Sequence, residues 1–161
     1  MPRVNQDPKR DKFARFPGLA GLALLLAGFV LLAVPARAET IKFEAMLDQD
    51  QAVPAPTAVA EAGGRAYVTL ETDGNVIAWV IEYYSLSGEI VAIHIHGPAG
   101  HGESGDVSVT IDNTSETVGE LTGSAQISPE QVQQLMDGLW YVNVHTELNG
   151  PGEIRGQLIQ Q

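Results

Sequence analysis

Ile93-His94-Ile95-His96-Gly97-Pro98 alternates isoleucine with histidine and then ends in a glycine–proline pair. A second segment, Tyr141-Val142-Asn143-Val144-His145-Thr146, alternates in the same way. Side chains along a β-strand point to opposite faces in turn, so each segment sends its aliphatic residues to one face and its histidines to the other. If the two strands are neighbours, three imidazoles share one face of a sheet.

Period-two alternation continues through most of the chain after Glu39 and predicts further strands. Asp73-Gly74 predicts a hairpin turn, because Asp-Gly supplies the positive φ that tight turns need. Both faces of residues 76–84 carry apolar side chains, which predicts a strand covered on both sides. A long loop is expected over 48–64, which holds two prolines and a Gly63-Gly64 pair. The expected strands span 41–47, 66–71, 76–84, 91–96, 107–111, 118–127, 139–146 and 153–159.

One short helix is predicted near 129–137. Ser128 can cap it, Pro129 suits its first position and Gln131 completes a capping box. An apolar stripe and a terminating glycine follow, at Val132, Leu135, Met136 and Gly138. Many short strands with a single helix predict an all-β fold, an antiparallel β-sandwich of Greek-key-like connectivity.

The first 38 residues have the composition of an export signal. A basic segment precedes an apolar run over 18–34, and Ala36-Arg37-Ala38 fits a small-x-small cleavage site. The run is long for a signal peptide and short for a spanning helix, so an uncleaved N-terminal anchor stays open as the alternative. Either way, residues 39–161 are expected to form one exported domain, periplasmic or extracellular.

The expected domain lacks cysteine and is strongly acidic. Three basic residues stand against eighteen acidic ones over 39–161, a formal charge of −15. A surface of that sign repels nucleic acid and anionic lipid, and it favours cations and basic partners. The expected partners are therefore a metal ion or an extracytoplasmic protein, with membrane contact only through a retained leader.

The histidines are the strongest candidates for chemistry. An H-x-H pair on a strand places two imidazoles about 6.5–7 Å apart at Cα on one face, a spacing that can chelate one ion. His145 from a neighbouring strand would complete a site suited to copper or zinc, and His101 is a fourth candidate. The alternative is that His94 and His96 hydrogen-bond polar neighbours and order the end of a sheet.

Arg155 is the second candidate, because few charged side chains are buried without a partner. Its position in the strand pattern puts it on the face opposite Ile154, and a carboxylate such as Glu153 or Glu147 would fix it in an ion pair. The alternative is an arginine that attracts anions beside a metal.

Two polar residues share the face of His145. Tyr141 and Asn143 could orient the metal ligands through hydrogen bonds, and Glu153 belongs to the same group of candidates. They could equally be ordinary polar strand residues.

Taken together, several segments resemble the CHRD (chordin-type) domain family, over about Ile41 to Leu158. The resemblance implies an extracytoplasmic β-rich domain, found alone in bacterial proteins and repeated in the animal protein that names the family; it implies no activity. His101 falls in a variable loop, and Gln51 stands where the family tends to have an acidic residue. The segments are Phe43-Glu44-Ala45, Val53-Pro54, residues 92–98, residues 141–146 and residues 152–158.

A weaker similarity links the order of the histidines to the copper ligands of copper/zinc superoxide dismutases. It would map copper ligands to His94, His96, His101 and His145, with Arg155 guiding the anion. The disulfide cysteines are missing, and too few ligands remain for a separate zinc site.

Three hypotheses follow. The first is a non-enzymatic exported domain that binds a metal ion or a partner through the histidine face. The second is a copper-dependent redox enzyme of the superoxide dismutase type, which the negative charge disfavours because it repels anionic substrates. The third is a structural scaffold in which the histidines and Arg155 form a hydrogen-bonded network.

Overall fold

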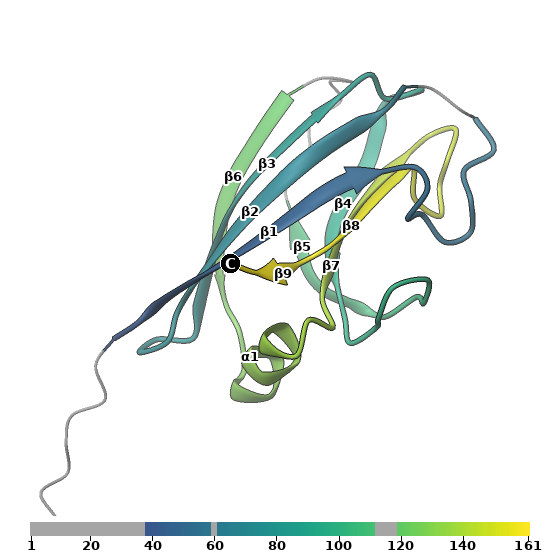
Figure 1. The fold of residues 1–161 in the computed structure, drawn as a ribbon. Helices are drawn as coiled ribbons and strands as arrows, with labels where there is room; N and C mark the ends of the chain where they lie inside the picture. Colours follow the sequence, from purple (N-terminus) through teal and green to yellow (C-terminus); the bar gives the residue numbers. More distant parts are fainter. Residues whose placement is uncertain (1–37, 59–60, 112–118) are drawn as a thin grey trace, which may run out of the picture. The chain divides into compact units, whose positions relative to one another are not determined.

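A computed structural model describes residues 38–58, 61–111 and 119–161 (Figure 1). The predicted leader, residues 1–38, lies outside these ranges except for its last residue. In the described ranges, no helix has the length and apolar character needed to cross a membrane. The elements are β1 (Thr40–Asp48), β2 (Gly63–Glu71), β3 (Val76–Tyr84), β4 (Ile90–His96), β5 (Val107–Ile111), β6 (Gly119–Gln126), α1 (Pro129–Met136), β7 (Tyr141–Thr146), β8 (Ile154–Gln157) and β9 (Ile159–Gln160).

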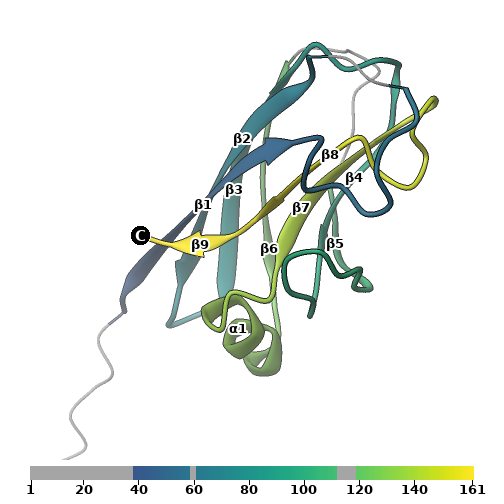
Figure 2. The ribbon, with the colours of Figure 1, turned by 45° about the vertical axis from the view of Figure 1, so that its right-hand side comes forward.

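The strands form one antiparallel sheet that curls on itself and is nearly closed (Figures 1 and 2). Its order is β5-β4-β7-β8-β1-β2-β3-β6, and β9 pairs with β1. The predicted all-β antiparallel fold is confirmed. One layer consists of β5, β4, β7 and β8, and the other of β1, β2, β3 and β6. The two layers are continuous, because β8 pairs with β1 where Asp48 lies opposite Arg155.

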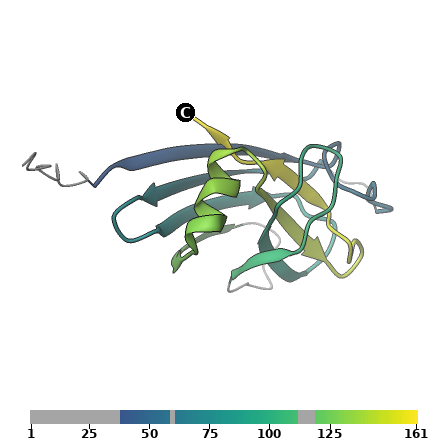
Figure 3. The same cartoon turned by 90° about the horizontal axis from the view of Figure 1, so that it is seen from below.

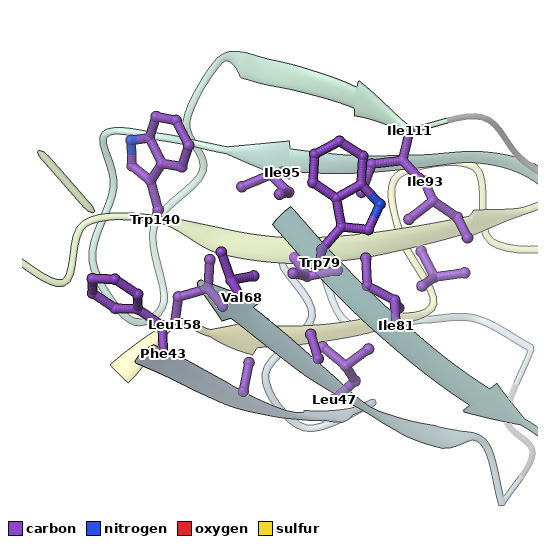
Figure 4. Packing of buried hydrophobic residues seen from close by; sticks show 14 of the residues in the cluster. Phe43, Leu47, Val68, Trp79, Ile81, Ile93, Ile95, Ile111, Trp140 and Leu158 are labelled. Atoms are coloured by element: carbon purple, nitrogen blue, oxygen red, sulfur yellow. The ribbon is translucent and has the colours of Figure 1, made fainter. Parts of the chain in front are cut away.

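The core lies between the two halves of the curled sheet. Trp79 and Ile81 from β3 approach Ile93 and Ile95 from β4, with Trp140 close by (Figure 4). These side chains are at most 7 % exposed. Burying one large apolar side chain stabilises a fold by about 1.5–3 kcal/mol, so the alternation in β3 and β4 contributes much of the stability.

Helix α1 lies across one end of the curled sheet (Figure 3). Its predicted capping box is present: the Gln131 amide donates to the Ser128 hydroxyl at 3.2 Å, and the Ser128 amide donates to the Gln131 side chain at 2.9 Å. Leu135 is fully buried, and Gly138 ends the helix at φ +71°. The helix therefore closes this end of the core as its sequence predicts.

Two details of the β2–β3 hairpin differ from the sequence expectation. The positive φ in its turn, 50°, belongs to Asn75 and not to the Asp73-Gly74 pair. Gly63 and Gly64 belong to β2 and not to the preceding loop. A side chain at Gly63 would meet the Tyr84 hydroxyl on β3, so the glycine allows a close cross-strand contact and does not mark a turn.

Strand β3 is buried on one face only, so the prediction of two covered faces is wrong. Ile77, Trp79 and Ile81 face the core, whereas Ala78 is exposed and Val80 is half-buried. Small and β-branched residues tolerate such a partly exposed surface.

The last predicted strand, 153–159, is two short strands. β8 pairs with β7 and touches β1 at one residue, and β9 turns to pair with β1 alone. Leu158 lies between them, is fully buried and donates its amide to the Trp140 carbonyl at 2.9 Å. The buried leucine therefore fixes the point where the chain changes partners.

Candidate metal site

Pairing between β4 and β7 brings three histidines onto one face of the sheet. Opposite residues are His94 with Asn143, His96 with Tyr141, and Ala92 with His145. The aliphatic residues of both strands face the core and are completely buried: Ile93, Ile95, Val142 and Val144. Because burial fixes the register, the histidines have to lie together on the outer face, as the alternation predicts.

The three imidazole rings form a compact triangle. Their centroids lie 5.3 Å apart for His94–His96, 5.0 Å for His94–His145 and 5.7 Å for His96–His145. One ring nitrogen from each lies within 4.8 Å of the others, and Nδ1 of His94 is 3.3 Å from Nε2 of His145. Ligands about 2.0–2.1 Å from a tetrahedral ion lie about 3.3 Å apart. One pair already has this separation, and the third nitrogen lies within 4.8 Å of both.

Backbone carbonyls fix the tautomers of two rings. Nδ1 of His96 lies 3.0 Å from the Gly105 carbonyl, and Nδ1 of His145 lies 2.9 Å from the Gly150 carbonyl. A carbonyl only accepts, so both Nδ1 atoms carry hydrogen and both Nε2 atoms present a lone pair. Nε2 of His96 is buried without a partner. Hydrogen bonds of this kind orient imidazole ligands in metal proteins.

His94 closes the triangle. Since Nε2 of His145 is an acceptor, Nδ1 of His94 donates to it when no ion is bound. If an ion took this nitrogen pair, the His94 proton would have to move to Nε2. The contact is therefore both a hydrogen bond of the free domain and a ligand pair with suitable spacing.

The electrostatic environment keeps the imidazoles neutral. Burial lowers the pKa of His94, and the charges of His145 and His96 lower it further. Burial also lowers the pKa of His96 and of His145, against the opposing effect of their carbonyl hydrogen bonds. Neutral imidazole is the form that binds metal ions, so few protons compete at neutral pH.

Asn143 lies on β7 between His94 and Arg155. Its Nδ2 donates to the Pro151 carbonyl at 3.2 Å, and its Oδ1 is buried without a partner. Gly152 has φ +135°, and a Cβ there would collide with the Asn143 amide. The glycine thus makes room for an amide with a free acceptor beside the histidines.

Tyr141 stacks against His96, with ring centroids 5.0 Å apart and planes 5° from parallel. Its hydroxyl accepts a hydrogen bond from the Gly105 amide at 3.1 Å. Gly105 is also the residue whose carbonyl holds His96. Tyr141 therefore contacts His96 directly and also fixes the backbone that holds its ring.

Arg155 is 1 % exposed, and among the described residues no carboxylate pairs with it. The predicted ion pair with Glu153 or Glu147 is wrong. Instead, Nη2 donates to the Gly100 carbonyl at 2.9 Å and to Oε1 of Gln157 at 2.8 Å. The guanidinium lies 3.8 Å from the centre of the Tyr141 ring, and burial lowers its pKa. Such burial does not favour the anion-attracting interpretation.

Glu153 is completely buried and turns away from the histidines. Its carboxylate accepts hydrogen bonds from the Thr146 hydroxyl at 2.6 Å and from the amide and hydroxyl of Ser87, each at 2.7 Å. Burial alone would raise its pKa, but these hydrogen bonds outweigh burial and lower it. Glu153 precedes β8 and follows the unusual backbone of Gly152, so the alternation of β8 does not reach it.

His101 lies apart from the other histidines. It is exposed and lines an open hollow with Glu44, Met46 and Gln157, whereas the group of close ligand atoms contains only His94, His96 and His145. The structure therefore does not bring the fourth candidate into the cluster.

Sequence reasoning missed three residues around the cluster. Gly105 and Gly150 contribute carbonyls, which no side-chain pattern reveals. Gln157 bonds Arg155 and donates to the Ala99 and Gly138 carbonyls at 2.9 and 2.8 Å. In the sequence, only its place in the Arg155-Gly156-Gln157 motif could have drawn attention to Gln157. The structure shows that the strand around it is fully buried.

The fold and site define a nearly closed all-β domain with a three-histidine cluster on its outer face. Residues 43–158 match the family model of the CHRD domain, and the chain belongs to this family. The comparisons with curated proteins and with solved structures returned no match.

Proposed function

We propose that this domain binds a single transition-metal ion, copper or zinc, through His94, His96 and His145. The observation that carries the proposal is the convergence of three neutral imidazoles, with nitrogens within 4.8 Å of one another. Two of the rings are already held by carbonyls in the tautomer that leaves Nε2 unprotonated.

The donor set favours particular ions. Three imidazole nitrogens suit zinc and copper, whereas calcium and magnesium prefer oxygen ligands. No carboxylate joins the cluster of close ligand atoms among the described residues. Membership of the CHRD family supports a binding role over catalysis, and the burial of Arg155 offers no route for an anionic substrate.

Calorimetric titration of residues 39–161 with Zn(II) and Cu(II) tests the proposal, since residues 35–161 form one compact unit. We expect one ion per chain with a dissociation constant below about 10 μM. His145→Ala removes one of three ligands and should weaken binding by at least about 100-fold. His101→Ala is the matched control, because it removes a histidine outside the cluster and should change nothing.

Weak binding, or binding that survives a His94→Ala/His145→Ala double variant, would exclude this function. Thermal unfolding with and without a chelator separates it from the structural scaffold. When the free ion is present at a concentration 100 times its dissociation constant, binding stabilises the fold by about 2.7 kcal/mol. A chelator removes that stabilisation. If the histidines only form a network, His145→Ala lowers the melting temperature equally with and without chelator.

The same proposal includes export, to the periplasm or outside the cell. It is supported by the basic segment before residue 18, the apolar run over 18–34 and the small residues Ala36 and Ala38. N-terminal sequencing of the protein recovered from its native host should find Glu39 first. Recovery of an intact N-terminus would instead indicate a retained anchor.

A further inference from the structure

Arg155 carries a buried charge that no carboxylate of the described residues neutralises. It is 1 % exposed, and its Nε and Nη1 atoms are buried without partners. Burying an unpaired charge is costly, so an arginine is an expensive choice here compared with an apolar residue. Besides the Gln157 side chain and the Tyr141 ring, it contacts the backbone of one segment, residues 97–105, which joins β4 to β5.

Three side chains from β7 and β8 hold this segment along its length. Arg155 donates to the Gly100 carbonyl, and Gln157 donates to the Ala99 carbonyl. Tyr141 accepts from the Gly105 amide. Arg155 also binds Gln157 at 2.8 Å and covers the Tyr141 ring at 3.8 Å, so it contacts both of the other two. The removal of Arg155 would loosen all three attachments.

The far end of the segment controls His96. The Gly105 carbonyl accepts from Nδ1 of His96 at 3.0 Å and thereby fixes which nitrogen is free. In the sheet, β7 lies between β4 and β8, so the ring of Tyr141 stands on the strand that separates His96 from Arg155. Arg155 is therefore joined to His96 by two routes, through the 97–105 segment and through the stacked ring of Tyr141.

We propose that Arg155 is a positioning residue of the histidine cluster: by holding residues 97–105, it keeps the Gly105 carbonyl on Nδ1 of His96 and so presents Nε2 to an incoming ion. The effect on the ion rests on the proposed function. The effect on the His96 tautomer does not, and it can be measured in the metal-free domain.

Nitrogen-15 NMR of the imidazole rings reads the tautomer directly. In the metal-free domain at pH about 8, where imidazole is neutral, His96 should be wholly in the Nδ1–H form. Arg155→Met should produce a mixture of the two tautomers at His96 and leave His145, which is held by Gly150, unchanged. Arg65→Met is the matched control, because Arg65 also lies over a tyrosine ring, and it should leave His96 unchanged.

Arg155→Lys keeps the charge but replaces the planar guanidinium, which covers the Tyr141 ring and reaches Gly100 and Gln157 through Nη2, by a flexible ammonium, so it should also mix the tautomers while disturbing packing less. It serves as the second variant if Arg155→Met does not fold. A pure Nδ1–H form of His96 in a folded Arg155 variant would overturn the proposal.

Zinc affinity gives the second readout. Loss of a group that orients a ligand weakens metal binding by about 10–100-fold, and we expect this loss for both Arg155 variants and none for Arg65→Met. Unchanged zinc affinity beside a mixed tautomer would also contradict the proposal. If the unaltered domain binds no zinc, the proposed function fails, and the tautomer measurement still decides whether Arg155 positions His96.

Discussion

Two arginine–tyrosine pairs of this domain have similar chemistry and opposite surroundings. Arg65 lies 5.9 Å from the centre of the Tyr67 ring, with an exposed side chain and an ion pair to Glu44 at 3.4 Å. Arg155 lies 3.8 Å from the centre of the Tyr141 ring and is buried. Its hydrogen-bond acceptors are the Gly100 carbonyl and the amide oxygen of Gln157, whereas Arg65 pairs with a carboxylate.

The difference shows that an arginine in an ion pair need not contribute more to stability or to the site than an arginine without one. Exposed pairs are screened by water and typically contribute little to stability. The buried cation is tied to a connecting segment by directional hydrogen bonds, and that segment reaches the histidine cluster. We therefore expect changes at the buried pair to disturb both stability and the site, and changes at the exposed pair to disturb neither.

The largest difference should come from truncating each arginine to alanine. Arg155→Ala leaves a cavity and strips the Gly100 and Gln157 oxygens of their donor, which should destabilise the domain by about 4 kcal/mol. Arg65→Ala should leave the urea midpoint within error of the unaltered protein. Similar urea midpoints for the two variants would mean that the buried arginine stabilises the domain no more than the exposed one.

A buried acid extends the comparison to negative charge. Glu153 is held by Ser87 and Thr146, so Glu153→Gln places an amide where three donors converge and should cost about 3 kcal/mol at pH 7. Glu44→Gln, which affects only the exposed ion pair, is the control and should be close to neutral.

The same residue predicts an acid-sensitive stability. The pKa of Glu153 is lowered by its hydrogen bonds, so the folded state binds its proton less readily than the unfolded state, whose value is near 4.5. This contribution is complete above that value and is lost as the pH falls through the folded pKa. Urea unfolding from pH 7 to 3 should show a steeper loss below 4.5 for the unaltered protein than for Glu153→Gln, and parallel curves would argue against the role of Glu153.

The smallest effect should come from single hydroxyl groups. Tyr141→Phe removes the acceptor of the Gly105 amide but keeps the stacked ring, and should cost about 1 kcal/mol. Tyr67→Phe removes only a contact with the Arg65 guanidinium at 3.2 Å and should have no measurable effect on thermal unfolding. Equal shifts in melting temperature would mean that the hydroxyl of Tyr141 does not hold the 97–105 segment.

Local rules predict what depends on neighbours in the sequence. The alternation around His94 and His145 predicts their shared face, and Ser128 with Gln131 predicts the helix cap, because both depend on positions a few residues apart. The partners of Arg155 could not be predicted in this way. Gly100 lies 55 residues away and contributes a carbonyl, and every residue has a carbonyl whatever its side chain.

The departures from prediction have a shared physical origin. Sequence alone places Gly63 in a loop because glycine often marks turns, yet the residue lies in β2, where the side chain of Tyr84 on β3 leaves no room for a Cβ. The sequence offers Glu153 as a carboxylate partner for Arg155, yet Gly152 has φ +135° and the alternation begins only with β8, after Glu153. In both cases a tertiary contact or a glycine conformation overrides the pattern of neighbouring residues.

X-ray absorption of the domain loaded with one equivalent of zinc shows directly whether the histidines bind the ion. We expect three imidazole nitrogens about 2.0–2.1 Å from the zinc, with the outer-ring scattering of histidine, and the loss of one such ligand in His145→Ala. A zinc environment of oxygen ligands alone, or a spectrum identical in His145→Ala, would contradict it.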